Sequence, residues 1–305
     1  MTRPSCWSPW WRRIAEVAAV PPFAGAIGYA LATTGSAKRR QSLTAILWLT
    51  AFVGLTAASP PSAAKQPPPK VMLWSWFADD DFHPLADRPV GVAYLALSLQ
   101  FDGQNQVEPS PRSIPVRIPP KMYQMVVVRF DNRLDTSGRP AFSAQQRELA
   151  VDMIGETVDL ARPQGVQIDF DAPRTAWPLY RQLLFEVRKR IGPSVFLSMT
   201  ALVSWCGATG SWLSELPVDE IVPMAFSMGQ ATPAIVTMLQ RGGQFQFAGC
   251  RPSIGVELPV GYTVPPGHDY DLLVRPRSGQ RAYFFVGAQK WSHELVLRAQ
   301  KAFLP

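Results

Sequence analysis

The stretch Gly165-Val166-Gln167-Ile168-Asp169-Phe170-Asp171 alternates apolar and polar side chains. Successive side chains of a β-strand point to opposite faces, so the apolar residues share one face and Gln167, Asp169 and Asp171 share the other. This pattern predicts a strand that packs against helices on one side and presents acids to a polar interior on the other.

Short β-prone runs recur on both sides of this strand and alternate with helical stretches, which is typical of parallel α/β proteins. Eight strands in about 240 residues predict a (β/α)₈ TIM barrel, for which roughly 250 residues is usual. A doubly wound open sheet is the alternative. The predicted strands are Val71–Phe77, Val90–Leu99, Met125–Phe130, Val166–Asp171, Val195–Ala201, Glu220–Phe226, Ser253–Leu258 and Ala282–Gly287.

Helices are predicted between these strands where an apolar face follows a capping residue. One begins after the capping-box pattern of Ser143 and Gln146, one covers Trp177–Ile191, and one follows Ser292. The first unit differs, because two prolines interrupt the segment after the first strand. We therefore expect the first helix of the barrel to be short or missing.

The N-terminus has the parts of a secretory signal peptide: the basic Lys38-Arg39-Arg40, the uncharged run 42–58 and small residues up to Ala64. That run has an apolar core of about 15 residues, short of the ~20 that span a bilayer, which favours cleavage over a permanent anchor. We expect a periplasmic or secreted protein, with a membrane partner only if this segment stays uncleaved. The predicted parts are residues 1–64 as extension and signal peptide or anchor, 65–70 as a Pro-rich linker, and 71–305 as the barrel.

Composition argues against several classes of partner. Residues 1–64 hold six of the 30 basic and one of the 23 acidic side chains, so most of the net charge of +7 belongs to the export segment. The remainder has no basic cluster with interleaved aromatics, which argues against nucleic acid. No glycine-rich phosphate motif indicates a nucleotide cofactor, and the scattered histidines, His83, His268 and His293, do not predict a metal site.

Two cysteines, Cys206 and Cys250, remain beyond the export segment. An even pair in an exported protein is compatible with one disulfide bond, and this pairing is favoured over two unpaired thiols packed as small apolar groups.

The two acids of the opening stretch are the leading candidates for chemistry. In a barrel, Asp169 and Asp171 point inward, with Asp171 nearest the C-terminal mouth where such enzymes keep their active sites. Carboxylates about 6 to 7 Å apart oppose each other's ionisation, which favours a protonated acid that can act as a proton donor. The alternative is a structural pair tied to Arg129 or to backbone donors.

The segment Gly165–Pro173 resembles the strand-four signature of family 18 glycoside hydrolases, the chitinase-like barrels, and Val222–Phe226 resembles their sixth-strand Met-x-Tyr/Phe element. The resemblance implies that Asp171 matches the catalytic acid and Asp169 the last aspartate. It also implies a mechanism in which the acetamido group of the substrate is the nucleophile. Two departures are visible, since Gln167 replaces an acid and Asp171 is one methylene shorter than the expected glutamate.

Nearly all of the chain beyond residue 64 is similar to a bacterial family of exported proteins, domain of unknown function 3142. That resemblance implies a glycosidase-like barrel. It is carried by Trp74-Ser75-Trp76, Gln167–Asp171, Ser198–Leu202, Ser204-Trp205-Cys206, Val222–Met224 and Met228-Gly229.

The predicted partner is therefore a carbohydrate. We expect a glycoside hydrolase, with a non-catalytic carbohydrate-binding barrel of the cell envelope as the alternative. Glu257 could supply a nucleophile across the barrel or form a salt bridge at the rim. Flat rings near strand ends favour sugar stacking. The candidate substrate-binding residues are Trp74, Trp76, Arg129, Gln167, Trp205, Met224, Phe226, Glu257 and Trp291.

Overall fold

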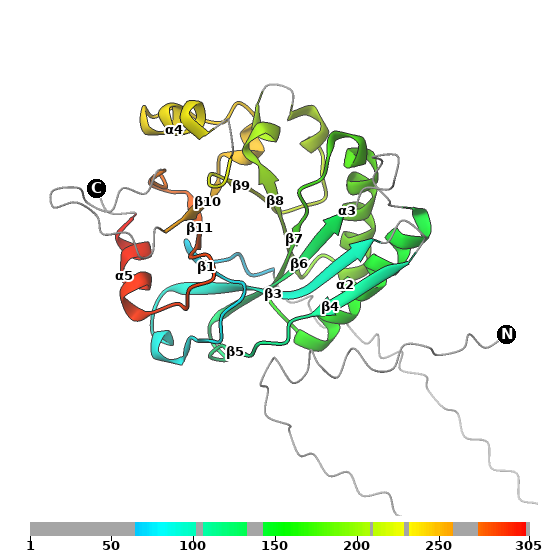
Figure 1. Ribbon diagram of the computed structural model, residues 1–305, viewed down its shortest axis with the longest axis horizontal. Coiled ribbons are helices and arrows are strands. Elements are labelled where there is room, and N and C mark those ends of the chain that lie inside the picture. The colour runs from blue at the N-terminus through cyan, green and yellow to red at the C-terminus, as the bar shows by residue number, and fades with distance from the viewer. Residues whose placement is uncertain are drawn as a thin grey trace, which may run out of the picture. The chain divides into compact units, whose positions relative to one another are not determined.

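The computed structural model describes residues 65–101, 106–132, 143–207, 210–228, 232–258 and 274–302. Eight parallel strands in this part of the chain form a closed barrel, in which each strand pairs with the next and β1 pairs with β3 (Figure 1). This confirms the predicted TIM barrel over the open sheet. The barrel strands are β1 (Val71–Ser75), β3 (Val90–Phe101), β6 (Tyr123–Asn132), β7 (Gly165–Asp169), β8 (Phe196–Leu202), β9 (Glu220–Met224), β10 (Ser253–Glu257) and β11 (Arg281–Phe285).

The first two units carry no α-helix in the residues that the structure describes. Between β1 and β3 lie only the two-residue strand β2 (Asp80–Asp81) and the 3-10 helix η1 (His83–Leu85), as the prolines of this segment predicted. After β3 the chain turns back into the antiparallel strand β4 (Val107–Pro111), and β5 (Val116–Arg117) then pairs with β2. This hairpin was not predicted, because a proline-rich edge strand gives little β signal of its own.

Four α-helices follow later strands: α2 (Ala144–Ala161), α3 (Trp177–Ile191), α4 (Thr232–Gln240) and α5 (His293–Lys301). Helices α2 and α3 lie side by side on one flank of the barrel and α5 on the opposite flank (Figure 1). The capping box of α2 is formed, since the Ser143 amide donates to Gln146 Oε1 at 2.8 Å and Ser143 Oγ accepts from the Gln146 amide at 3.2 Å.

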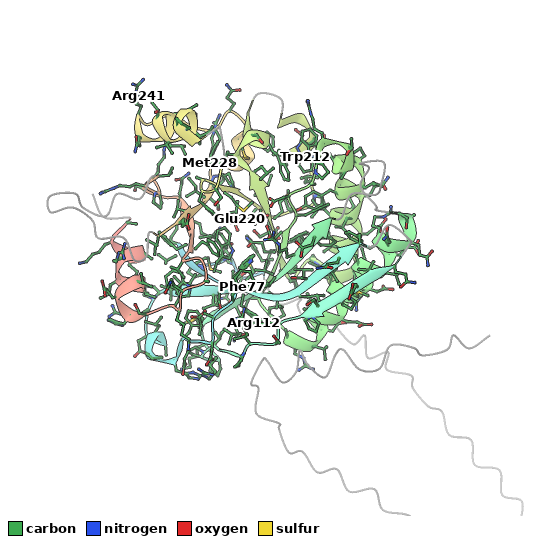
Figure 2. All side chains as sticks on the ribbon, in the orientation of Figure 1. Phe77, Arg112, Trp212, Glu220, Met228 and Arg241 are labelled. Atoms are coloured by element: carbon green, nitrogen blue, oxygen red, sulfur yellow. A yellow bond between two sulfur atoms is a disulfide. The ribbon has the colours of Figure 1, made fainter. Side chains whose placement is uncertain are left out.

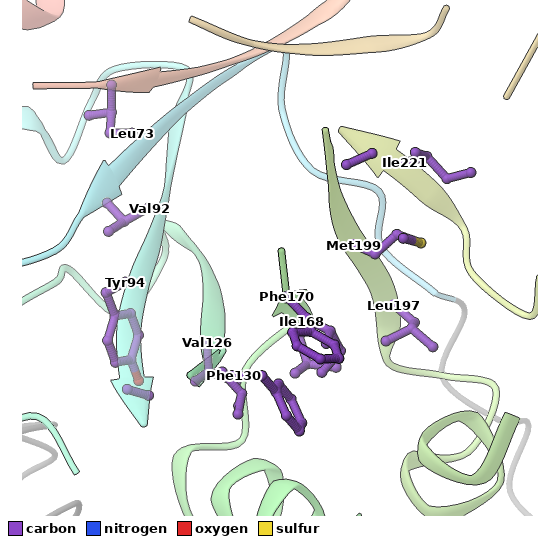
Figure 3. Packing of buried hydrophobic residues seen from close by; sticks show 14 of the residues in the cluster. Leu73, Val92, Tyr94, Val126, Phe130, Ile168, Phe170, Leu197, Met199 and Ile221 are labelled. Atoms are coloured by element: carbon purple, nitrogen blue, oxygen red, sulfur yellow. The ribbon is translucent and has the colours of Figure 1, made fainter. Parts of the chain in front are cut away.

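Side chains of alternate residues divide the strands between two apolar layers. One layer lies between strands and helices and includes Ile168 and Phe170 (Figure 3), with the Phe170 ring 5.1 Å from that of Tyr180 on α3. The other fills the barrel interior and includes Met125 and Val222. The predicted division of the faces of β7 is therefore confirmed.

Residues 65–70 are extended, as predicted for a linker, but they are bound to the barrel. The Arg281 guanidinium, at the start of β11, donates to the carbonyls of Pro68 and Pro69 at 2.8 to 3.1 Å. Pro68 is buried, and Lys65 Nζ lies 2.5 Å from Asp219 Oδ1. The segment thus belongs to the folded domain.

The predicted export segment, residues 1–64, lies outside the described residues. Within the described part, none of the helices combines the length and the apolar character needed to cross a bilayer.

A disulfide bond joins Cys206 to Cys250, with their Cα atoms 5.9 Å apart. Cys206 ends the 3-10 helix η3 (Val203–Cys206) that follows β8, and Cys250 ends the 3-10 helix η6 (Ala248–Cys250) that precedes β10. Both cysteines are buried. The bond therefore ties the loop at the mouth of β8 to the segment leading into β10.

We predict that replacing both cysteines with serine lowers the free energy of unfolding by about 2–4 kcal/mol, because a cross-link across a long loop restricts the unfolded chain. Urea unfolding with and without reductant measures this. Reductant should shift the midpoint of the parent protein and leave that of the serine variant unchanged. An unchanged parent midpoint in reductant would contradict the bond.

Candidate functional site

A cavity of about 330 Å³ opens at the end of the barrel where the carboxyl ends of the strands meet. Its lining comes from β1, β6, β7, β8, β9 and β11 and from the residues that follow β1, β7, β8 and β9. This is the face at which barrels of this kind assemble their active sites. The lining falls into an acidic wall and an aromatic wall.

The acidic wall is built on the neighbouring strands β6, β7 and β8. Asp169, at the end of β7, is only 4 % exposed and accepts a hydrogen bond of 2.7 Å from Thr200 Oγ1. Arg129 stands beside it in register on β6, with Nη1 3.5 Å from Asp169 Oδ2 and Nε 3.1 Å from Asp131 Oδ1. The guanidinium therefore lies between two carboxylates.

Asp171 lies just beyond the end of β7 and lines the same cavity. The residue is solvent-exposed, and its carboxylate makes no hydrogen bond or ion pair with another residue of the described part of the chain. Among the described residues, both of its oxygens are thus left open to a ligand at the cavity.

Both acids of this wall hold a proton more readily than an ordinary aspartate. Burial, reinforced by the charge of Asp171, raises the pKa of Asp169 to about 6, although Arg129 and the hydrogen bond from Thr200 oppose the shift. Although its side chain reaches solvent, desolvation by the surrounding cavity wall also raises the pKa of Asp171, against the effect of Arg129 and with that of Asp131. The pair can therefore hold and release a proton in mildly acidic solution.

The aromatic wall consists of four rings that contact one another in a closed circuit. The ring centroids are 6.2 Å apart for Trp74 and Trp76, 6.0 Å for Trp76 and Phe285, 5.5 Å for Phe285 and Phe226, and 6.0 Å for Phe226 and Trp74. A Cβ atom on Gly255 would lie 2.7 Å from Trp74 Cη2, so this glycine of β10 makes room for the indole.

The two walls face each other across the mouth. In the order of the strands around the barrel, β11 is four strands from β7 in either direction, which places Phe285 opposite the strand of Asp169. The cavity therefore presents flat apolar surface on one side and hydrogen-bonding carboxylates on the other.

A chain of buried hydrogen bonds connects the aromatic wall to the barrel interior. Trp74 Nε1 donates to Gln167 Oε1 at 2.8 Å, and Gln167 Nε2 donates to Ser198 Oγ at 3.0 Å. Gln167 is completely buried, so it does not reach the cavity and instead orients the Trp74 indole.

These hydrogen bonds continue to Glu220, which begins β9 and lies inside the ring of strands (Figure 2). Its carboxylate accepts from Ser198 Oγ at 3.2 Å and Tyr283 Oη at 2.6 Å, accepts also from Ser253 Oγ, and forms an ion pair with Arg281. The sequence interpretation missed this network, whose only signal was a polar residue at the start of several otherwise apolar strands.

The structure brings seven of the predicted site residues together in the cavity lining: Trp74, Trp76, Arg129, Asp169, Asp171, Met224 and Phe226. Residues that the sequence interpretation did not single out complete the lining: Thr200, Leu202, Val203, Ser204, Ser227, Met228 and Phe285. Their common feature is a position at or just after a strand end.

Besides Gln167, three predicted residues lie outside the cavity lining. Trp205 packs against Trp212 with ring centroids 5.0 Å apart, and Trp291 Nε1 donates to the Trp74 carbonyl at 2.8 Å, which supports β1 from behind. Glu257 is exposed at the end of β10 and forms no ion pair with the described residues, so neither of its predicted roles is seen. The described residues also contain no group of three or more potential metal ligands.

No family model matches the chain, and no curated protein is similar to it in sequence. The likeness to domain of unknown function 3142 therefore rests on the quoted motifs alone.

Several solved structures show a weak likeness to this chain, among them the following three. The spore cortex-lytic enzyme SleL of Bacillus cereus is 13% identical with a TM-score of 0.42, over 62% of this chain and 50% of that enzyme. SleL of Bacillus megaterium is 12% identical with a TM-score of 0.44, over 70% of this chain and 55% of that enzyme. The chitinase RmChi1 of Rhizomucor miehei is 12% identical with a TM-score of 0.41, over 62% of this chain and 69% of that chitinase. The likeness thus spans about half of the first enzyme, and at TM-scores below 0.5 it carries no argument about activity.

We predict that Asp169→Asn raises the free energy of unfolding above that of the parent protein at pH 7.5 and changes it little at pH 4. With a pKa of about 6 in the folded state against 3.8 unfolded, Asp169 binds more protons when folded, so stability falls as the pH rises from about 4 to above 6. Removing the charge should restore about 3 kcal/mol at pH 7.5 and little at pH 4. Urea unfolding at both pH values tests this, and an equal effect at the two would contradict it.

We predict that Gln167→Leu destabilises the protein by about 1–3 kcal/mol, because it leaves the buried Trp74 N–H without an acceptor. Chemical unfolding measures the cost, and indole fluorescence reports the loosened ring. In a Trp74→Phe background Gln167→Leu should lower the free energy of unfolding by less, since the indole N–H that loses its acceptor is no longer present. An undiminished cost in that background would place the effect of Gln167 elsewhere.

Proposed function

We propose that this protein is an exported hydrolase that cleaves a glycosidic bond in an envelope or extracellular polysaccharide, with Asp171 as the general acid. The observation that carries the proposal is the Asp171 carboxyl at the cavity, which has no partner among the described residues and lies beside a buried second acid and opposite a wall of aromatic rings.

The contrast between the walls suits a sugar. A pyranose ring has apolar C–H faces that stack on flat rings such as Trp74 and Trp76, and an equator of hydroxyl groups that donate to carboxylates. A cavity of about 330 Å³ is at the lower end of ligand-site volumes, consistent with one or two sugar units held at the mouth.

The reaction has two steps, cleavage of the glycosidic bond and addition of water, and Asp171 transfers a proton in each. Protonated Asp171 donates its proton to the glycosidic oxygen as the bond from that oxygen to the anomeric carbon breaks. Water then adds to the anomeric carbon, and the proton that it loses returns to the Asp171 carboxylate. The resemblance to family 18 implies that the acetamido group of the substrate holds the anomeric carbon between the two steps.

Asp169 and Arg129 act as positioning groups in this scheme. Desolvation and the charge of Asp131 raise the pKa of Asp171 and help to keep the acid protonated before the reaction, while Asp169, whose own pKa is raised by the charge of Asp171, holds a second proton site beside it. Arg129 contacts Asp169 and Asp131 and makes no ion pair with Asp171. The acid is therefore left open toward the substrate.

The alternative is a carbohydrate-binding barrel without catalysis. It is favoured by the short reach of Asp171 and by Gln167, which stands where the family pattern has an acid and is fully used in holding Trp74. A displacement of about 1 Å in a catalytic group can cost ~100-fold in rate.

The test is hydrolysis of chitin-type, peptidoglycan-type and exopolysaccharide oligosaccharides by the purified protein beside Asp171→Asn and Asp171→Glu. We predict that the asparagine variant loses about 10²- to 10⁴-fold in kcat while it still binds, because general acid catalysis contributes about this much. The glutamate variant, which keeps an acid, should retain activity.

The kcat of the parent protein should fall as the pH rises above the raised pKa of Asp171, since the donor must be protonated. Binding of the same panel without cleavage by any of the three proteins would establish the non-catalytic alternative.

A further inference from the structure

The charges around the cavity do not balance. Asp169, Asp171 and Asp131 face one cation, Arg129, and Arg129 contacts two of the three acids. Even with one proton on the pair of Asp169 and Asp171 the wall keeps a net charge of −1, and with none it keeps −2. In the described part of the cavity lining no second cation compensates it.

The hydrogen-bonding groups are biased in the same direction. The Trp74 N–H is donated to Gln167 and the Thr200 hydroxyl to Asp169, whereas both oxygens of Asp171 are without a partner among the described residues. The rings of Phe226 and Phe285 bring no polar atom. The cavity therefore has strong acceptors to offer and has already used two of its donors.

The wall opposite the acids also favours a cation. The face of an aromatic ring carries negative potential and attracts an ammonium group that approaches within about 6 Å of its centroid. Trp74 and Trp76 line the same cavity as the carboxylates, so an ammonium group between the walls that reaches a ring face would gain from both.

We propose that the glycan of this site carries free, protonated amino groups, as in a partly de-N-acetylated hexosamine polymer, and that the ammonium is held at the acidic wall. This rests on the proposed carbohydrate site and names its substrate class. An ammonium has three donors and no acceptor, which matches unpartnered carboxylate oxygens. A uronate would instead meet like charge, and an acetamido group at the acidic wall would offer the carboxylates one N–H donor in place of three. The acetamido group that the family 18 mechanism uses would therefore belong to a different sugar unit of the partly de-N-acetylated polymer from the unit that carries the ammonium.

The experiment compares binding of two probes at pH 6 by calorimetry: a β-1,4-linked glucosamine hexamer and its fully N-acetylated counterpart. We expect the amino form to bind at least about tenfold more tightly, a difference of 1.4 kcal/mol. Its binding should weaken as salt is raised, because the carboxylate side of the site is open to solvent, while binding of the neutral form should not change.

Two variants separate the charge effect from damage to the fold. Asp171→Asn is nearly isosteric and should remove most of the preference for the amino form. Glu148→Gln removes a similar charge from an exposed position on α2, outside the barrel, and should leave the preference intact.

The outcomes keep the two proposals apart. Equal or tighter binding of the N-acetylated hexamer overturns the cationic preference and leaves the carbohydrate site standing. An amino preference that persists in Asp171→Asn also overturns the assignment to this wall. Binding of neither hexamer, nor of any glycan in the hydrolysis panel, overturns both the preference and the proposed function.

Discussion

The Glu220 carboxylate, buried inside the barrel, is the constraint on which much of this structure depends. A buried charge is tolerated only when it is paired and fully hydrogen-bonded, and here its four partners lie on three other strands, β8, β10 and β11. Toward the N-terminal end, Arg281 also holds the carbonyls of Pro68 and Pro69. Toward the mouth, Ser198 leads through Gln167 to Trp74. One interior charge thus couples the entry of the chain into the barrel to a ring of the proposed binding site.

The cavity concentrates an energetic cost where the proposed chemistry needs it. Burial of Asp169 raises its pKa to about 6, so the folded state is less stable at neutral pH than an uncharged residue there would make it. The same burial keeps a proton available beside Asp171, and the rings opposite supply apolar contact that carboxylates cannot. A site of this kind trades stability for a shared proton and a preference for particular ligands.

Residues in local patterns could be predicted, and residues that depend on distant neighbours could not. The alternation in Gly165–Asp171 predicted an inward acidic face, and strand ends predicted Arg129, Met224 and Phe226 at the mouth. Phe285, Thr200 and Glu220 were missed, since each belongs to a strand that reads as ordinary core. Glu257 was placed at the site because it ends a strand, but the rings of Phe226 and Phe285, from the strands on either side of β10, contact each other and complete the wall without it.

The sequence by itself determined the eight strands, the faces of β7, the capped helices and the two acids, because these depend on side-chain period and capping within a few residues. Only the tertiary structure decided that β1 closes on β3, that residues 65–70 bind the barrel, and that four rings from β1, β9 and β11 stand opposite Asp169. These relations join residues far apart in the chain. They are set by closure of the barrel and by the need to pair its buried polar groups, and neither leaves a periodic signal in the sequence.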